Sequence, residues 1–305
     1  MLKSVVFLSD LVFPVCWFEK KKKLKSQNKQ NKINMADLIS IFFLPFLQNY
    51  PIILTATATC FAFQHLSFVL AALNFPSFVL LKKESQLDFS VRCVAILHCL
   101  SSFFTVRGYL FPTGEISTDL YVPDPYAHFF YCLTTGYFLW DIFVSIYYRW
   151  GPGFICHAFL SFGVFYFGLY PFCQFDMRYF HGVFEISTIF LHLREVLPLI
   201  GKENSIFYKL FGATFAVTFF LIRIVFGFKT SYESWIKVLN LFSQGTYHSS
   251  FVLTYFLVAN GILMSLQVYW FFLLLKNIFG HTSVAEENLD ARGNELPPDQ
   301  KKKKN

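Results

Sequence analysis

Long runs of apolar residues alternate with short polar connections along most of this chain. A helix that crosses the hydrocarbon core of a bilayer needs about 20 predominantly apolar residues. Windows of this kind occur at 51–73, 91–111, 126–148, 152–175, 179–200, 205–228 and 251–275. The pattern therefore predicts an all-α fold, a polytopic membrane protein with about seven transmembrane helices.

The connections between these windows are short and leave no room for a soluble domain. Pro123, Asp124 and Pro125 form a turn signal between the second and third windows. The longest connection is 229–250, in which we expect 235–242 to lie on the membrane interface or to dip back into it. The chain is thus expected to divide into a basic, disordered extension (1–34), a first transmembrane helix with its preceding segment (35–84), a six-helix membrane domain (85–280) and a disordered tail (281–305).

Composition narrows the class of protein. The chain has 305 residues, of which 55% are hydrophobic, 21% aromatic and 15% charged, whereas soluble domains carry roughly 25% charged residues. Of the formal net charge of +7, residues 1–34 contribute +6. The high apolar and low charged content excludes a soluble enzyme. The basic residues are concentrated in one short run instead of spreading over a folded surface, so we expect no nucleic-acid partner.

Lysine and arginine in short loops predict the orientation. If seven helices alternate from a lumenal N-terminus, most of these basic residues fall on one side of the membrane. The positive-inside rule makes that side cytosolic, and the C-terminus lies on the same side. The basic run at 20–32 does not fit this arrangement. Two explanations are open: translation starts at Met35 and 1–34 is a spurious extension, or 5–18 is an interfacial anchor. The loop residues on the predicted cytosolic side are Lys82, Lys83, Arg92, Arg149, Lys202 and Lys276.

The C-terminal tail carries a candidate retrieval signal. Lys302 and Lys303 stand four and three residues from the C-terminus, the pattern by which coat proteins retrieve cargo to the endoplasmic reticulum. We therefore expect an endoplasmic-reticulum protein whose tail binds the coat-protein retrieval machinery. The alternative is an ordinary solvated lysine tail.

Polar side chains recur on one face of several predicted helices. In the window 179–200, His181, Glu185, Thr188, His192 and Glu195 are spaced so that they form one stripe on an α-helix. Ionisable groups in a spanning helix are costly and usually face a cavity or a partner. The stripe indicates a cavity for an amphipathic lipid or an acyl-CoA-like ligand, and helix–helix hydrogen bonding is the alternative. The residues predicted to line this cavity are His98, Asp141, His157, His181, Glu185, Thr188, His192, Arg223, Asn260 and Gln267.

The sequence shows few signs of catalysis. It contains no HExxH, GxSxG or glycine-rich phosphate loop, and its seven cysteines have no metal-ligand spacing. We therefore expect no metal and no cofactor. The catalytic candidates are His157 as a general base, with Glu185 or Asp141.

Several strings resemble the TLC-domain family, in the family's order and over roughly 85–280. They include Gly136-Tyr-Phe-Leu-Trp-Asp141, Phe154-Ile-Cys-His157, the segment from Phe184 to Arg194, and the segment from Asn260 to Phe271. The resemblance implies a multi-pass protein of the endoplasmic reticulum tied to lipid homeostasis, with membrane lipids as partners and helices two to seven ringed around a central cavity.

The sequence also differs from the ceramide synthases of this family. Ceramide synthases of this family carry a His-His pair where His157 is followed by Ala158, so the acyltransferase residue set is incomplete. Three functions remain open. The favoured one is lipid handling without catalysis; the others are a ceramide-synthase-like N-acyltransferase, which uses acyl-CoA and a sphingolipid base, and a lipid transporter or cargo receptor.

Overall fold

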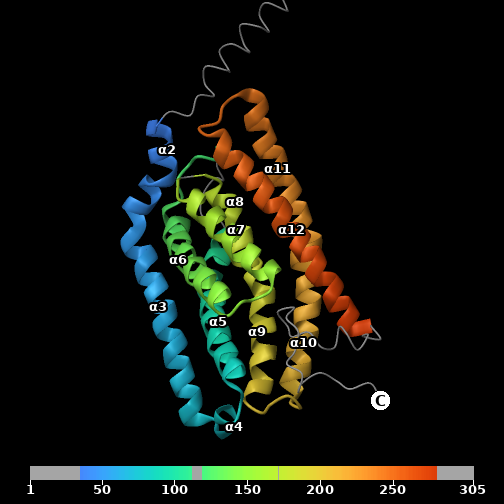
Figure 1. Cartoon of the computed structure of the whole chain (residues 1–305). Coiled ribbons are helices and arrows are strands. Elements are labelled where there is room, and N and C mark those ends of the chain that lie inside the picture. The colour runs from blue at the N-terminus through green and yellow to red at the C-terminus, as the bar shows by residue number, and fades with distance from the viewer. Residues whose placement is uncertain (1–34, 112–118, 171, 280–305) are drawn as a thin grey trace, which may run out of the picture.

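The structure is a computed structural model that describes residues 35–111, 119–170 and 172–279. Every regular element in these ranges is a helix, so the all-α prediction is confirmed. In chain order (Figure 1) they are α2 (Met35–Phe42), α3 (Leu44–Asn74), α4 (Pro76–Val79), α5 (Lys83–Leu110), α6 (Pro125–Tyr147), α7 (Pro152–Gly168), α8 (Gln174–Arg178), η1 (Tyr179–Val183), α9 (Glu185–Leu199), α10 (Ile206–Thr218), η2 (Phe219–Phe226), α11 (Gly227–Gln244) and α12 (Ser250–Phe279).

Local chemistry explains where several helices begin and end. Asp124 caps α6, because its carboxylate accepts from the backbone N–H of Ala127 at 3.1 Å and a proline occupies the first turn. Ser205 caps α10 in the same way through Tyr208. Gly245 ends α11 in the left-handed region, with φ of 67°.

The number of membrane spans differs from the prediction. Five helices of the described part are long and apolar enough to cross a membrane: Ile39–Asn74, Lys83–Arg107, Ala127–Tyr147, Ile206–Gln244 and Ser250–Ile278. The count of seven is therefore not confirmed. The fourth predicted window is reduced to the 17 residues of α7, and the fifth is divided among η1 and α9 and carries ionisable residues.

The connection expected at 229–250 is helical for most of its length. Residues 206–244 form one uninterrupted helical rod of 39 residues, about 58 Å long at 1.5 Å per residue. No proline interrupts this stretch of the sequence, so the helix continues until Gly245. The polar residues of α11 therefore lie on a helix and not in a connection.

Two of the elements are π-helices, and both break the regular α-helical phase. η1 covers five residues and η2 covers eight. π-Helical turns are rare in proteins, but those that do occur are often found at functional sites. Each of them here carries an ionisable side chain, His181 in η1 and Arg223 in η2.

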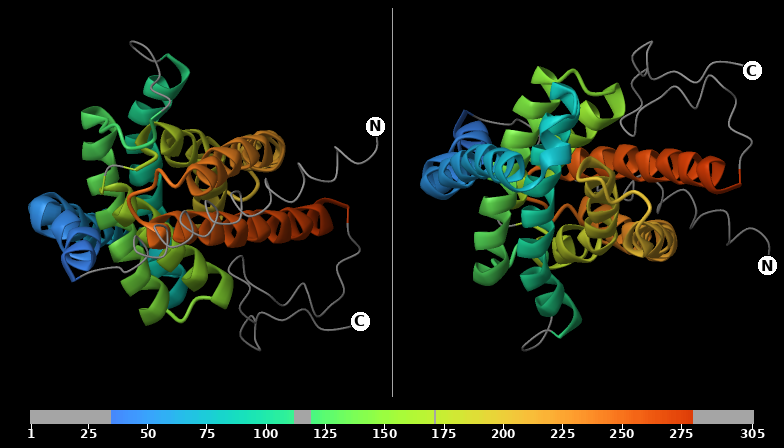
Figure 2. Two further views of the ribbon diagram at one scale, coloured as in Figure 1. Left: turned by 90° about the horizontal axis from the view of Figure 1, so that it is seen from above. Right: turned by 90° about the horizontal axis from the view of Figure 1, so that it is seen from below.

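The helices pack as a bundle with α3 at one side and α11 and α12 at the other (Figure 1). Seen from above or below, α12 lies across the bundle and extends away from α3 (Figure 2). Gly136 allows α3 and α6 to approach closely, because a Cβ there would lie 2.5 Å from the carbonyl oxygen of Ile53. Thr57 donates across this contact to the carbonyl of Gly136 at 2.9 Å.

Candidate functional site

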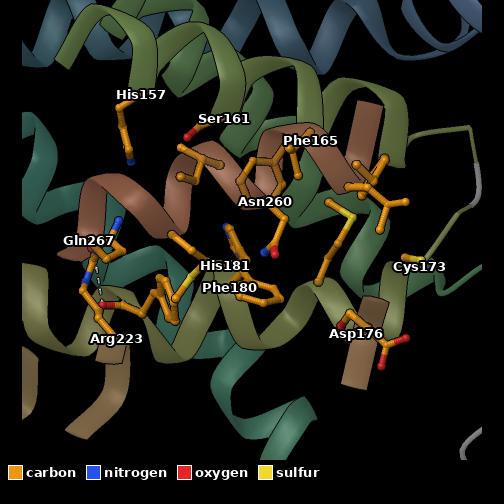
Figure 3. A pocket seen from close by; sticks show the side chains of 18 of the residues that line it. His157, Ser161, Phe165, Cys173, Asp176, Phe180, His181, Arg223, Asn260 and Gln267 are labelled. Carbon is orange, nitrogen blue, oxygen red and sulfur yellow. Dashed lines mark hydrogen bonds between the residues drawn. The ribbon is translucent and has the colours of Figure 1, made fainter. Parts of the chain in front are cut away.

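A pocket opens between α7, η1, α11 and α12 (Figure 3). Its empty volume is about 1050 Å³, including the part that is open to the outside. The walls come from α5, α6, α7, α8, η1, α9, η2, α11 and α12, and none of the lining residues belongs to α3. Most of the wall is apolar: Phe138, Val164, Phe165, Met177, Phe180, Phe184, Val238, Phe256, Leu257, Leu263 and Met264.

The structure brings together seven of the ten side chains that the sequence nominated for a cavity. They lie on six different elements. The seven lining residues are His98, His157, His181, Glu185, Arg223, Asn260 and Gln267.

Arg223 is the most connected of these side chains. It is 8% exposed, and its Nε donates to Ser187 Oγ at 2.8 Å while Nη1 donates to Gln267 Oε1 at 2.9 Å. Nη2 donates to Thr188 Oγ1 at 2.5 Å and to the carbonyl of Phe184 at 3.2 Å. The guanidinium therefore ties η2 to α9 and α12 at one end of the pocket (Figure 3).

Two lining histidines belong to a buried hydrogen-bonded chain. His181 Nδ1 contacts Thr105 Oγ1 at 2.9 Å, and its Nε2 contacts Thr134 Oγ1. His98 Nε2 also contacts Thr134 Oγ1, at 3.3 Å, and its ring stacks on Tyr137 with centroids 3.9 Å apart. These contacts join α5, α6 and η1 and fix both rings at the pocket wall.

Glu185 and His157 make fewer polar contacts. Glu185 Oε2 accepts from Cys99 Sγ at 3.2 Å, a weak donor. His157 packs against Phe138 and Trp270, with ring centroids 5.9 and 5.7 Å apart, and forms no hydrogen bond with any described residue. Its imidazole points into the pocket (Figure 3).

The other three nominated residues do not line the pocket. Asp141 is 8% exposed on α6. Thr188 accepts a hydrogen bond from the Arg223 guanidinium. His192 Nδ1 is buried with no hydrogen-bond partner in the described part of the chain. The predicted stripe assumed a regular α-helix from His181 onward. His181 in η1 and Glu185 at the start of α9 do line the pocket, but the pocket wall does not extend further along α9, so Thr188, His192 and Glu195 lie beyond it.

The opposite end of the pocket contains residues that the sequence did not nominate. Asp176 pairs with Lys237 at 2.6 Å, and Trp235 Nε1 donates to Asn260 Oδ1 at 2.8 Å. Trp235 is 38% exposed, so this end is the more open one. Burial raises the pKa of the Cys173 thiol well above its usual range, and the Asp176 carboxylate adds to this. Helical periodicity across 227–244 is the signal that could have identified the contribution of α11.

The pocket combines apolar walls with a few polar side chains. Within the described ranges, no group of three or more His, Cys, Asp or Glu side chains is placed to hold a metal ion. The pocket offers an apolar enclosure, one buried guanidinium, three imidazoles and two carboxylates, of which, among the described residues, only that of Asp176 is paired, with Lys237. This set suits an amphipathic ligand with a polar headgroup.

Comparison with known proteins finds the same family by a sequence profile and by two of the similar relatives. Residues 88–276 match the sequence profile described as the TLC domain. An uncharacterized TLC domain-containing protein of Schizosaccharomyces pombe is 28% identical over 200 residues, 62% of this chain and 65% of the relative. One of Saccharomyces cerevisiae is 33% identical over 146 residues, 45% of this chain and 44% of the relative. A third, the topoisomerase I damage affected protein 4 of the same yeast, is 28% identical over 149 residues, 47% of this chain and 53% of the relative.

The chain thus spans less than two thirds of the length of each of these relatives. The matched range lies inside the predicted six-helix domain and contains every residue of the pocket.

Proposed function

The chain belongs to the TLC-domain family, and from this premise we propose that it holds a membrane lipid in its pocket without acting on it as an enzyme. The observation that carries the proposal is the largely apolar lining of the pocket, with a buried guanidinium at one end. Binding sites for amphipathic ligands combine apolar walls with a few convergent polar groups. In this reading the protein contributes to lipid homeostasis as a lipid-handling protein.

The test is to identify what co-purifies with the protein. The full chain is purified in a mild detergent, and bound lipids are extracted and measured by mass spectrometry. Val164→Trp on α7 places an indole in the pocket and should displace the lipid, whereas Phe159→Trp, on the same helix and 50% exposed, should retain it. Equal lipid content in both variants, or none in the parent chain, contradicts the proposal.

A second candidate function is N-acylation with acyl-CoA as donor. The observation in its favour is the His157 imidazole, which faces the pocket together with Glu185 and has no hydrogen-bond partner among the described residues. Against it, the histidine pair of ceramide synthases is missing, since Ala158 follows His157. Microsomes that contain this chain should then convert acyl-CoA and sphinganine to product, and His157→Ala should abolish the conversion while the exposed His65→Ala should not.

Residence in the endoplasmic reticulum and a cytosolic C-terminus are part of the same proposal. Lys302 and Lys303 lie outside the described residues, and their spacing from the C-terminus supports retrieval by coat proteins. Replacing both with alanine should release the protein to later compartments in fluorescence microscopy, whereas replacing Lys301 and Lys304 should leave it in place. Within the family, the strings that resemble the TLC domain, taken together, favour the branch of TLC domain-containing protein 4.

A further inference from the structure

The buried Arg223 forms no hydrogen bond or ion pair with an acidic side chain among the described residues. All four of its acceptors are neutral, from Ser187, Gln267, Thr188 and the carbonyl of Phe184. None of the ion pairs among the described residues includes it. Since a guanidinium has five N–H donors, one N–H on Nη1 stays available, and a full positive charge faces the pocket.

Two neutral groups converge on the same place. Gln267 is 2% exposed and uses only its Oε1 toward Arg223, so its side-chain NH₂ donates to no described residue. His157 lies on the facing helix α7 with its ring directed toward Gln267 (Figure 3). An anion at this point would meet donors from η2 and α12, with the imidazole at its side. A phosphate has enough oxygens to use all of them.

A negative charge stands close to this cluster. Glu185 lines the pocket. Phe184, directly before it, and Thr188, three residues after it, both accept from Arg223. Those contacts place Glu185 at the same end of the pocket as the guanidinium. No described cation forms an ion pair with Glu185, and its one hydrogen-bond partner among the described residues is the weak donor Cys99.

Arg223 is buried and Glu185 is half-buried at a largely apolar wall. A charge in such surroundings without a counter-charge in contact is costly, and a ligand that supplies both counter-charges reduces that cost. The two charges do not pair with each other, so neither satisfies the other at contact. A ligand with a single charge would match only one of them. A headgroup that carries an anion and a cation matches both.

We propose that this end of the pocket binds the headgroup of a zwitterionic phospholipid, with its phosphate on Arg223 and Gln267 and its ammonium on Glu185. The acyl chains would lie along the apolar walls formed by side chains such as Phe180 and Met264 toward the more open end at Trp235. This inference rests on the proposed function and names the class of lipid.

The experiment titrates the full, delipidated chain in detergent with lipids that have identical acyl chains and different headgroups. The probes are phosphatidylethanolamine, phosphatidylcholine, phosphatidic acid and diacylglycerol, with soluble phosphoethanolamine as a chain-free probe. The two zwitterionic lipids should bind about tenfold more tightly than phosphatidic acid or diacylglycerol. Phosphoethanolamine should bind far more weakly, because it lacks the apolar part.

Variants separate the two charges. Glu185→Gln keeps the shape of the side chain and its contact with Cys99, and should make phosphatidic acid bind at least as well as the zwitterionic lipids. Arg223→Lys keeps the charge but loses the planar fork, and should weaken every phosphate-containing lipid. Glu195→Gln is the matched control, since this residue lies on the same helix, pairs with Arg194 and does not line the pocket.

An unchanged ranking of lipids in Glu185→Gln, or diacylglycerol binding as tightly as the zwitterionic lipids, would overturn the inference while leaving lipid binding intact. Phosphoethanolamine binding as tightly as the phospholipids would overturn the assignment to a lipid. Absence of binding by every probe would overturn this inference together with the proposed function.

Discussion

At the scale of single residues, Arg223 determines the polar end of the pocket. Its side chain is buried and its hydrogen bonds join three helical segments. Removing one acceptor from such a group leaves a charged donor without a partner in a site of low dielectric constant, which costs more than the loss of an ordinary hydrogen bond. The acceptors of Arg223 are therefore expected to be more sensitive to substitution than other buried hydroxyl groups.

Ser187→Ala tests this expectation. The change leaves Nε of Arg223 without its acceptor, and should lower the free energy of unfolding in detergent by about 1–3 kcal/mol. Ser102→Ala is the control, because Ser102 is equally buried and its hydroxyl donates only to the carbonyl of Cys99 in its own helix. If both variants lose the same stability in a denaturant titration, the charge of Arg223 does not matter to the fold.

The sequence identified many of the side chains in the pocket but not how they interact. His98, His157, Arg223 and Gln267 could be nominated because ionisable and amide groups are rare in apolar windows. Ser187, which accepts from Arg223, could not, since serine is common in such windows and nothing in the spacing marks it.

At the scale of elements, the π-helical segment η1 brings the backbone of one helix against another. Gly182 lies in η1, and a Cβ on it would lie 2.6 Å from Thr105 Oγ1 and 2.8 Å from the backbone nitrogen of Val106. A backbone atom cannot move away without shifting α5. The close approach also allows His181 to reach Thr105.

Gly182→Ala should therefore destabilise the protein by about 1–3 kcal/mol, as overpacking does, and lower the melting temperature in detergent. Gly153→Ala on α7 is the matched control, because its nearest neighbour would be a Leu266 methyl group at the ordinary distance of 3.6 Å. That variant should melt at the temperature of the parent chain or above it. Equal melting temperatures for the two variants would contradict the close packing of η1 on α5.

Element boundaries followed from the sequence where a cap or a proline marks them and failed where tertiary contacts decide. The turn before α6 was recognised from Pro123 to Pro125, and Asp124 caps the helix. The continuation of the helix through 229–244 was missed, since its charged residues resembled a connection. Its Lys229 and Glu233 in fact pair along the helix at 2.7 Å, and Trp235 and Val238 face the pocket.

At the scale of the whole molecule, several basic residues at the junctions between helices lie at the same end of the bundle. Lys82 and Lys83 lie at the start of α5, and the junction of α9 and α10 carries Lys202; both places are at the lower end in Figure 1. α11 rises to the opposite end and carries Lys237. The positive-inside rule favours a cytosolic location for the lower end.

Cysteine labelling in sealed microsomes tests this orientation. In a background without native cysteines, Lys202→Cys should react with a membrane-impermeant maleimide from the cytosolic side, since the residue is exposed. Lys237→Cys, whose side chain is 48% exposed, should react only after the membrane is opened with detergent. Labelling of both residues from the same side would contradict the arrangement.

The central claim is that the pocket between α7, η1 and α12 holds a lipid, and a density map of the full chain in lipid nanodiscs tests it most directly. The account predicts elongated density along Phe180 and Met264 that ends in a compact feature beside Arg223 and Gln267. A map in which side chains fill this space, or in which no density stands beside the guanidinium, would contradict it.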